Sequence, residues 1–285
     1  MRSLKLGLLL SLITLVIPSS AIAEEDYLSI SFSKKNQVRT AMIWIKFKSH
    51  LIMNAKSSRS SRLPRGSQAK VVADQLTRRD PTFSRVGKLF FTQDYGQVAQ
   101  CSASLVGDSG LIATAAHCVM AVNGDWNADF MFVRGYGSSD QDVFAIDCVA
   151  LRSVWGENSE EEILEADYAF LQSSRENTFG GLQLNTSGIV PSRLRIVGYS
   201  DEHQDGRQML ELPVRVFSEP GKLGALDNDF GKGNSGAPWI SLETPELFSI
   251  SSHYVQDDKN IMWGPRFDQK TRDLMDFTSR GCRHQ

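Results

Sequence analysis

The stretch Leu-Ile-Ala-Thr-Ala-Ala-His-Cys, residues 111–118, is the most informative segment of this 285-residue chain. Its apolar run from Leu111 to Ala116 predicts a buried β-strand that ends in a turn at His117. A histidine at such a point is either a core side chain with backbone partners or a group that a turn presents to a site. Two motifs further along the chain favour the second interpretation.

These two motifs supply a carboxylate and a hydroxyl. Asp167 begins Asp-Tyr-Ala-Phe-Leu, whose apolar residues predict a strand entering the core, although the preceding acidic run leaves open a merely solvated carboxylate. Ser235 lies in Gly-Asn-Ser-Gly-Ala-Pro, residues 233–238, which by itself is also a common turn sequence. Together with His117 they form the nucleophile, base and orienting carboxylate that nucleophilic hydrolysis requires.

The order His117, Asp167, Ser235 and its spacing resemble the trypsin/chymotrypsin family, and Gly-Asn-Ser-Gly resembles its bacterial secreted trypsin-like and glutamyl-endopeptidase branch. The resemblance covers residues 83–285. It implies an all-β fold of two antiparallel six-stranded β-barrels (chymotrypsin-like) with a short C-terminal helix. It also implies a serine endopeptidase that forms an acyl-enzyme at Ser235, with His117 as general base and acid and Asp167 orienting His117. We expect no cofactor and no metal site.

The same resemblance assigns the oxyanion hole to the backbone amides of Gly233 and Ser235. Each such donor is typically worth ~3 to 4 kcal/mol of barrier. Two positions depart from the family pattern: Asn234 replaces an aspartate that captures the freed N-terminus in trypsin-like zymogens, and Ala237 replaces a glycine. We therefore expect a different route of activation.

Substrate preference has competing candidates. Asp229 lies six residues before Ser235, where the family has the base of its specificity pocket, and a carboxylate there would select Arg or Lys. His253 resembles the histidine with which glutamyl endopeptidases receive acidic substrates. The alternatives are that Asp229 is a structural loop residue and that His253 is a polar residue at the rim of a strand.

The four cysteines are an even number, as expected in an oxidising compartment. The family resemblance implies a disulfide between Cys101 and Cys118 beside the catalytic histidine. Cys148 and Cys282 are then left to pair with each other, although four cysteines alone allow three connectivities.

Residues 1–23 have the pattern of a secretory signal peptide, with an apolar run from Leu6 to Ile17 and an Ala-x-Ala site ending at Ala23. The run is too short to span a bilayer comfortably, so we expect a secreted or periplasmic protein without a membrane anchor after signal removal.

Residues 24–82 are predicted to form a basic pro-segment. Residues 24–80 contain 12 basic and 5 acidic residues, a net charge of +7, whereas residues 81–285 carry a net charge of −11. These opposite charges favour docking of the basic segment on the acidic remainder of the chain. If Asp229 selects basic residues, then Arg62, Arg65 and Arg79 are candidate self-cleavage sites. The alternative is a solvated basic arm that binds surfaces or nucleic acid.

Short apolar or alternating runs separated by turn residues predict the remaining organisation. We expect an N-terminal barrel over residues 83–188 with His117 and Asp167, and a C-terminal barrel over residues 189–285 with Ser235 and a helix at Gln269–Ser279. The runs are 85–91, 99–106, 111–115, 130–134, 142–151, 168–172, 193–199, 210–217, 237–240 and 247–253. We expect a monomeric protease that acts on proteins or peptides and has no nucleic acid partner. A catalytically silent, protease-like binding protein is the alternative.

Overall fold

We describe a computed structural model of the chain, covering residues 26–33, 67–72, 80–93, 96–156, 164–203, 206–255 and 258–283. The predicted signal peptide and the candidate cleavage positions Arg62, Arg65 and Arg79 lie outside these residues. None of the helices within the described ranges is long and apolar enough to cross a membrane.

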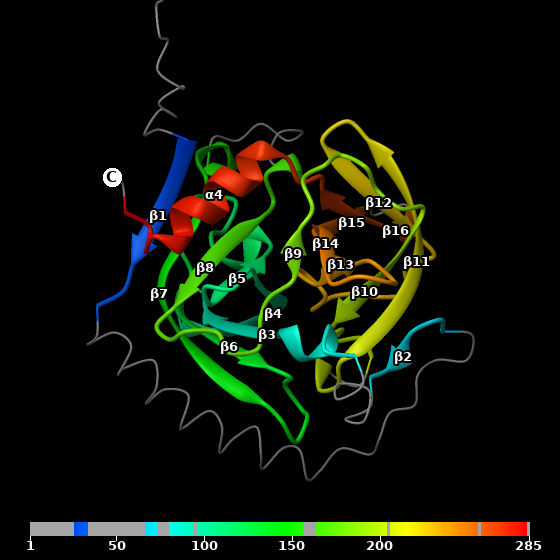
Figure 1. Cartoon of the computed structure of the whole chain (residues 1–285), viewed down its shortest axis with the longest axis horizontal. Coiled ribbons are helices and arrows are strands. Elements are labelled where there is room, and N and C mark those ends of the chain that lie inside the picture. The colour runs from blue at the N-terminus through cyan, green and yellow to red at the C-terminus, as the bar shows by residue number, and fades with distance from the viewer. Residues whose placement is uncertain are drawn as a thin grey trace, which may run out of the picture.

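The first half of the molecule is a closed antiparallel barrel (Figure 1). Its strands are β3 (Val86–Thr92), β4 (Val98–Val106), β5 (Leu111–Thr114), β6 (Ala128–Arg134), β7 (Asp142–Arg152) and β8 (Ala169–Ser173). They pair in the order β7-β6-β3-β4-β5-β8, and pairing of β8 with β7 closes the ring of six. The predicted runs of this half all became strands, since their apolar side chains fill the barrel interior.

The second half is built on a nine-stranded sheet. Its strands are β2 (Lys70–Val71), β9 (Gln183–Leu184), β10 (Arg193–Gly198), β11 (Leu210–Glu219), β12 (Lys222–Leu226), β13 (Pro238–Ile240), β14 (Glu246–Ile250), β15 (His253–Val255) and β16 (Asp258–Pro265). The order is β15-β16-β12-β11-β10-β13-β14-β9, with β2 beside β11 and a parallel β9–β14 pair. The all-β, chymotrypsin-like fold is thus confirmed, although in the described residues β15 and β9 do not pair to close this sheet into a six-stranded barrel.

Helix α4 (Gln269–Ser279) lies near the end of the described chain and has the bounds that the sequence predicted. Asp268 begins it with a capping box, in which its carboxylate accepts from the Thr271 amide and the Thr271 hydroxyl accepts from the Asp268 amide. The helix lies beside the first barrel (Figure 1). Leu274 and Phe277 are buried in the core of that barrel.

Two short strands come from the predicted pro-segment. β1 (Tyr27–Ser31) pairs with β7 of the first barrel, and the ring of Tyr27 stacks on Phe277 of α4 at 5.3 Å. β2 pairs with β11 of the second sheet. The described contacts of this segment thus include backbone pairing and aromatic packing, together with a hydrogen bond from Ser67 to the Asp229 carboxylate and an ion pair of Asp80 with Arg195 at 2.8 Å.

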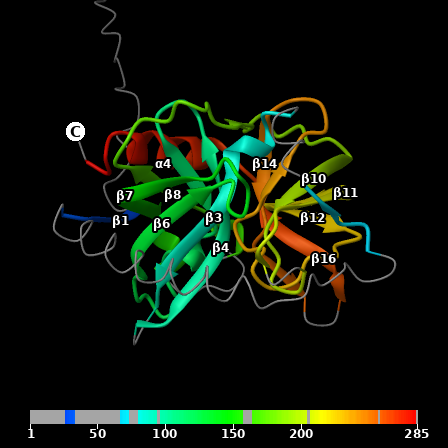
Figure 2. The ribbon, with the colours of Figure 1, turned by 90° about the horizontal axis from the view of Figure 1, so that it is seen from below.

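The two halves lie side by side and meet along β4, as the view from below shows (Figure 2). The apolar core of the first barrel continues into the second half at Ile240, Leu247 and Ile250. At the same seam the Ser102 amide of β4 donates to the carbonyl oxygen of Ser235 at 2.8 Å. The seam thus places the Ser235 segment against the first barrel.

Candidate active site

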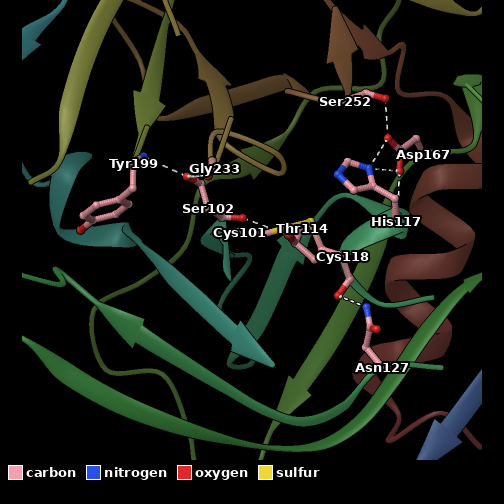
Figure 3. Close-up of a disulfide and its surroundings, with 10 residues drawn as sticks. All are labelled: Cys101, Ser102, Thr114, His117, Cys118, Asn127, Asp167, Tyr199, Gly233 and Ser252. Atoms are coloured by element: carbon pink, nitrogen blue, oxygen red, sulfur yellow. Dashed lines mark hydrogen bonds and ion pairs between the residues drawn. A yellow bond between two sulfur atoms is a disulfide. The ribbon is translucent and has the colours of Figure 1, made fainter. Parts of the chain in front are cut away.

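His117 lies in a turn of 3-10 helix, Ala116–Cys118, directly after β5. The disulfide between Cys101 and Cys118 ties this turn to β4, and the Asn127 side-chain amide donates to the carbonyl of Cys118 at 3.0 Å (Figure 3). The turn is therefore held from two sides. The His117 side chain is 31% exposed, so its ring remains accessible.

Asp167 is buried just before β8 and faces His117 (Figure 3). His117 Nδ1 lies 2.8 Å from Oδ2 and 3.1 Å from Oδ1, and the His117 amide donates to Oδ1 at 3.0 Å. The Ser252 hydroxyl also donates to Oδ2. These donors compensate a carboxylate that burial would otherwise make very costly.

The pKa values of the two groups move in opposite directions. Burial raises the pKa of Asp167, but the charge of His117 and hydrogen bonds from His117 and Ser252 outweigh it, so the pKa lies below its usual value. Burial lowers the pKa of His117, but the charge and hydrogen bond of Asp167 outweigh it and leave the pKa above 6.5. The arrangement stabilises an imidazolium paired with a carboxylate, which is the charge state a general base reaches during catalysis.

Ser235 lies near the His117 turn because the residue next to it, Gly236, packs against the end of β5. Gly236 packs so closely on β5 that a Cβ there would lie 2.2 Å from the Thr114 hydroxyl and 3.0 Å from the Ala115 amide. The Ser235 hydroxyl makes no hydrogen bond to His117 within the described atoms; such bonds are often long until a substrate closes the site.

The oxyanion loop, residues 231–236, has the backbone shape that its glycines allow. Gly233 and Gly236 have φ values of +84° and +77°, which other residues adopt only with strain. In the part of the chain described, neither the Gly233 amide nor the Ser235 amide donates to a protein acceptor. Both are therefore available to an oxyanion. Asn234 is buried and donates to the Ser251 hydroxyl at 3.0 Å.

The two specificity candidates lie in different surroundings. Asp229 neighbours His203, whose Nε2 is 2.6 Å from the Asp229 carbonyl and 3.8 Å from its carboxylate, and the Ser67 hydroxyl donates to that carboxylate. His253 instead lies at the Asp167 side: its Nδ1 is 3.0 Å from the Ser252 hydroxyl. Burial lowers the pKa of His253 and outweighs the opposing charge of Asp167, so this pKa lies below 6.5.

The cysteines and His117 cluster without forming a metal site. Cys101, His117 and Cys118 place their ligand atoms within 4.8 Å of one another. The two sulfur atoms are joined in a disulfide, so neither is available as a thiolate ligand. The second disulfide joins Cys148 of β7 to Cys282 after α4.

Sequence reasoning missed two neighbours of the site. Ser252 was not singled out, although a serine pair interrupting an apolar strand is a detectable signal. His203 had no motif around it, and its position beside Asp229 follows only from the folding of the loop after β10.

Comparison with known proteins agrees with this geometry. A profile described as trypsin-like peptidase domain matches residues 101–248, just over half of the chain. The chain belongs to the trypsin-like peptidase family. No curated protein sequence matches it.

Solved structures share the fold at low sequence identity. A thermostable serine protease, AL20, from an extremophilic microorganism has 22% identity and a TM-score of 0.62, with 70% of this chain and 99% of that chain covered. A Glu endopeptidase in complex with MPD has 16% identity and a TM-score of 0.62, with 75% and 97% covered. A scabies mite inactivated protease paralogue, S-I1, has 14% identity and a TM-score of 0.54, with 74% and 99% covered. The fold is therefore shared by active and inactivated members, and the chemistry has to be argued from the residues.

Proposed function

We propose that this trypsin-like peptidase is a secreted serine endopeptidase with Ser235, His117 and Asp167 as its catalytic triad. The observation that carries the proposal is the surroundings of Asp167, where a buried carboxylate receives two bonds from His117 and one from Ser252. This arrangement fixes the tautomer of His117 with its proton on Nδ1. Nε2 is then free to accept a proton.

The chemistry follows from this tautomer. His117 Nε2 takes the proton of the Ser235 hydroxyl as the oxygen attacks the peptide carbonyl, and Asp167 stabilises the resulting imidazolium. The Gly233 and Ser235 amides stabilise the oxyanion of the tetrahedral intermediate. His117 then protonates the leaving amine, giving an acyl-enzyme. Water then attacks this ester with His117 as general base, and His117 returns the proton to the Ser235 oxygen as the carboxylic acid product leaves.

For substrate preference we favour cleavage after Arg or Lys, with Asp229 at the base of the pocket. The Asp229 side chain is 33% exposed, so a long cationic side chain can reach it and displace the Ser67 hydroxyl. The alternative, acidic substrates received by His253, is weaker on physical grounds. A histidine with a lowered pKa is neutral at pH 7, and its nearest carboxylate is Asp167.

Export of the protein, signal removal and the pro-segment remain part of the proposal. Two disulfides suit an oxidising compartment. The residues that carry the signal and the candidate cleavage sites lie outside the described ranges. β1 and β2 show that parts of the predicted pro-segment contact the folded halves.

The triad is tested with a fluorophosphonate probe, which labels only an activated serine, and with peptide hydrolysis. Wild-type protein should be labelled at Ser235, while Ser235→Ala should lose labelling and ~10⁴ to 10⁶ of turnover with its melting temperature unchanged. Ser109→Ala, at an exposed loop serine, is the matched control and should behave as wild type. A soluble, folded wild-type protein without labelling would instead support the alternative of a catalytically silent, protease-like binding protein.

Specificity is tested with a randomised peptide library and mass spectrometry of every cut. Cuts after Arg and Lys that are lost in Asp229→Asn support the assigned pocket. Cuts after Glu or Asp that are lost in His253→Ala would overturn it.

A further inference from the structure

A lysine is buried in the seam between the two halves, close to the oxyanion loop. Lys88 of β3 is only 1% exposed, and its ammonium donates to the carbonyl of Gly206 at 2.5 Å. It lies 5.8, 5.2 and 5.6 Å from the ring centres of Phe90, Tyr136 and Tyr199. Aromatic faces attract a cation, so these rings hold the ammonium in place.

Asp201 faces Lys88 across Gly206. A Cβ placed on Gly206 would lie 2.5 Å from Asp201 Oδ1 and 2.7 Å from Lys88 Nζ, so both charged groups border the same glycine. The Gln100 side-chain amide of β4 donates to Asp201 Oδ1 at 2.5 Å. The carboxylate thus has a hydrogen bond from the first barrel and a cation nearby.

Asp201 also contacts the oxyanion loop directly. Its amide donates to the Lys232 carbonyl at 2.8 Å, and a Cβ on Gly233 would lie 2.7 Å from the Asp201 carboxyl carbon. The carboxylate therefore borders the residue whose amide forms the oxyanion hole. An uncompensated negative charge at that position would oppose an oxyanion.

Ser102 holds the other side of the same loop (Figure 3). Its hydroxyl accepts from the Tyr199 amide at 2.9 Å and donates to the Gly233 carbonyl at 3.4 Å. Gln100 and Ser102 are alternate residues of β4, so they project from one face of the strand. That face contacts both the Tyr199–Asp201 turn and Gly233.

The buried ammonium costs stability. Burial is the main cause that lowers the pKa of Lys88 to about 8, with Arg207 acting in the same direction and Asp201 opposing both. An apolar side chain of similar length would fill the same space without this cost. The position of the charge beside Asp201 and Gly233 gives it a role other than packing.

We propose that Lys88 is a positioning residue of the oxyanion hole: its ammonium holds the Gly206 turn by a hydrogen bond and attracts Asp201 by its charge, and these hold Gly233 with its amide directed at the reacting carbonyl. The proposal rests on the function proposed above. The cation also offsets the Asp201 charge as negative charge develops on the substrate oxygen.

The proposal predicts a loss of turnover as Lys88 loses its proton. The charged groups that act on it are Asp201 and Arg207. The rings of Tyr136 and Tyr199 also face it, and burial raises the pKa of both tyrosines. We expect kcat of the wild type to fall as the pH rises through about 8, with little change in KM. Lys88→Met should lower kcat about tenfold at pH 7, because one oxyanion donor is misdirected rather than removed. This variant should also lack the fall of kcat as the pH rises through about 8.

While kcat falls with rising pH, the free energy of unfolding of the wild type should rise. The folded pKa of Lys88 is about 8 and the unfolded one about 10.5, so between these values the unfolded chain binds more protons and the free energy of unfolding rises with pH. Lys88→Met should lack this rise and should melt no lower than the wild type at pH 7. A variant that is as stable yet slower separates positioning from general loss of structure.

A second variant checks the same cluster without touching Lys88. Asp201→Asn keeps an acceptor for Gln100 but removes the charge that supports the ammonium, so the alkaline fall in kcat should move to lower pH. Asp108→Asn, at an exposed loop carboxylate, is the matched control and should leave the profile unchanged.

The decisive measurement is therefore kcat and KM from pH 6 to 10 for these four proteins, with melting curves at each pH. The inference is overturned if Lys88→Met keeps the wild-type kcat and alkaline fall, or if its kcat loss is matched by a lower melting temperature. Wild-type protein without turnover dependent on Ser235 would overturn the proposed function instead, and the pH dependence of unfolding would still report the charge of Lys88.

Discussion

At the scale of single residues, the site depends on a charge pair that the fold protects from water on one side only. Asp167 is 2% exposed and fully supplied with donors, whereas the His117 ring is accessible. A substrate can therefore reach the imidazole without disturbing the carboxylate that orients it. In the proposed mechanism the neutral ring of His117 is the active form, so its raised pKa predicts that activity falls as the pH drops through a value above 6.5.

Asp167→Asn tests this pair. We expect kcat/KM to fall by ~10⁴, because the amide can stabilise the wrong tautomer of His117 and carries no charge. The remaining activity should have its acidic limb at lower pH, since the charge that raises the pKa of His117 is gone. Hydrolysis measured from pH 4 to 9 gives both quantities.

Ser252→Ala is a milder change to the same group, because it removes one hydrogen bond to Asp167 and keeps the carboxylate. Its loss of kcat/KM should be far smaller than that of Asp167→Asn. An acidic limb that does not move in Asp167→Asn would contradict the assignment of His117 as the base.

At the scale of elements, short turns and one helix hold the site rather than the strands alone. The turn Ala116–Cys118 presents His117 because β5 ends there and a disulfide fixes the end. Helix α4 covers the first barrel through Leu274 and Phe277 and makes contact with β1 through Tyr27. Its first turn depends on the Asp268 capping box.

Asp268→Ala should lower the free energy of unfolding by about 1 kcal/mol, because the Thr271 amide loses its acceptor at the start of α4. Thermal or denaturant unfolding measures the change. Asp276→Ala replaces an exposed aspartate later in the same helix and should change stability by less than ~0.5 kcal/mol. Equal effects of the two changes would show that the capping box does not stabilise α4.

At the scale of the whole molecule, two disulfides constrain segments of very different length in the chain. The Cys148–Cys282 disulfide closes a loop of 134 residues that contains β9 to β16, so that of the second sheet's described strands β2 lies outside it. The Cys101–Cys118 disulfide closes only 17 residues beside His117. The first constrains the chain as a whole and the second a local turn.

Replacing both Cys148 and Cys282 by serine should cost about 2 to 5 kcal/mol of stability, because the unfolded chain regains the freedom of a long loop. Turnover by the protein that remains folded should be close to wild type. The Cys101→Ser, Cys118→Ser pair should instead lower kcat as well as stability, since the His117 turn loses a constraint. Unfolding curves and initial rates below the melting temperature distinguish the two, and equal losses of kcat would contradict this division.

The structure shows where local patterns stop being informative. Strands with alternating or continuous apolar residues, such as β4 and β7, lie where the sequence placed them. β12 and β16 were missed, since Lys222, Gly224 and the charged start of β16 have low strand propensity. Pairing stabilises them: β12 pairs with the later part of β16, and the start of β16 pairs with β15. The apolar run 247–253 was predicted as one strand but forms β14 and β15 with Ser251 and Ser252 between them.

The sequence by itself determined the family, the all-β fold class, the bounds of α4 and the candidate triad, because each depends on a local pattern or on a motif in fixed order. The tertiary structure alone decided that Ser252 supports Asp167. It also decided that Ser67 and His203 neighbour Asp229. The same holds for the meeting of Lys88, Gln100 and Asp201 beside Gly233. These residues come from strands and loops up to 162 positions apart. Their meeting depends on how two β-structures pack against one another, and no local periodicity encodes that contact.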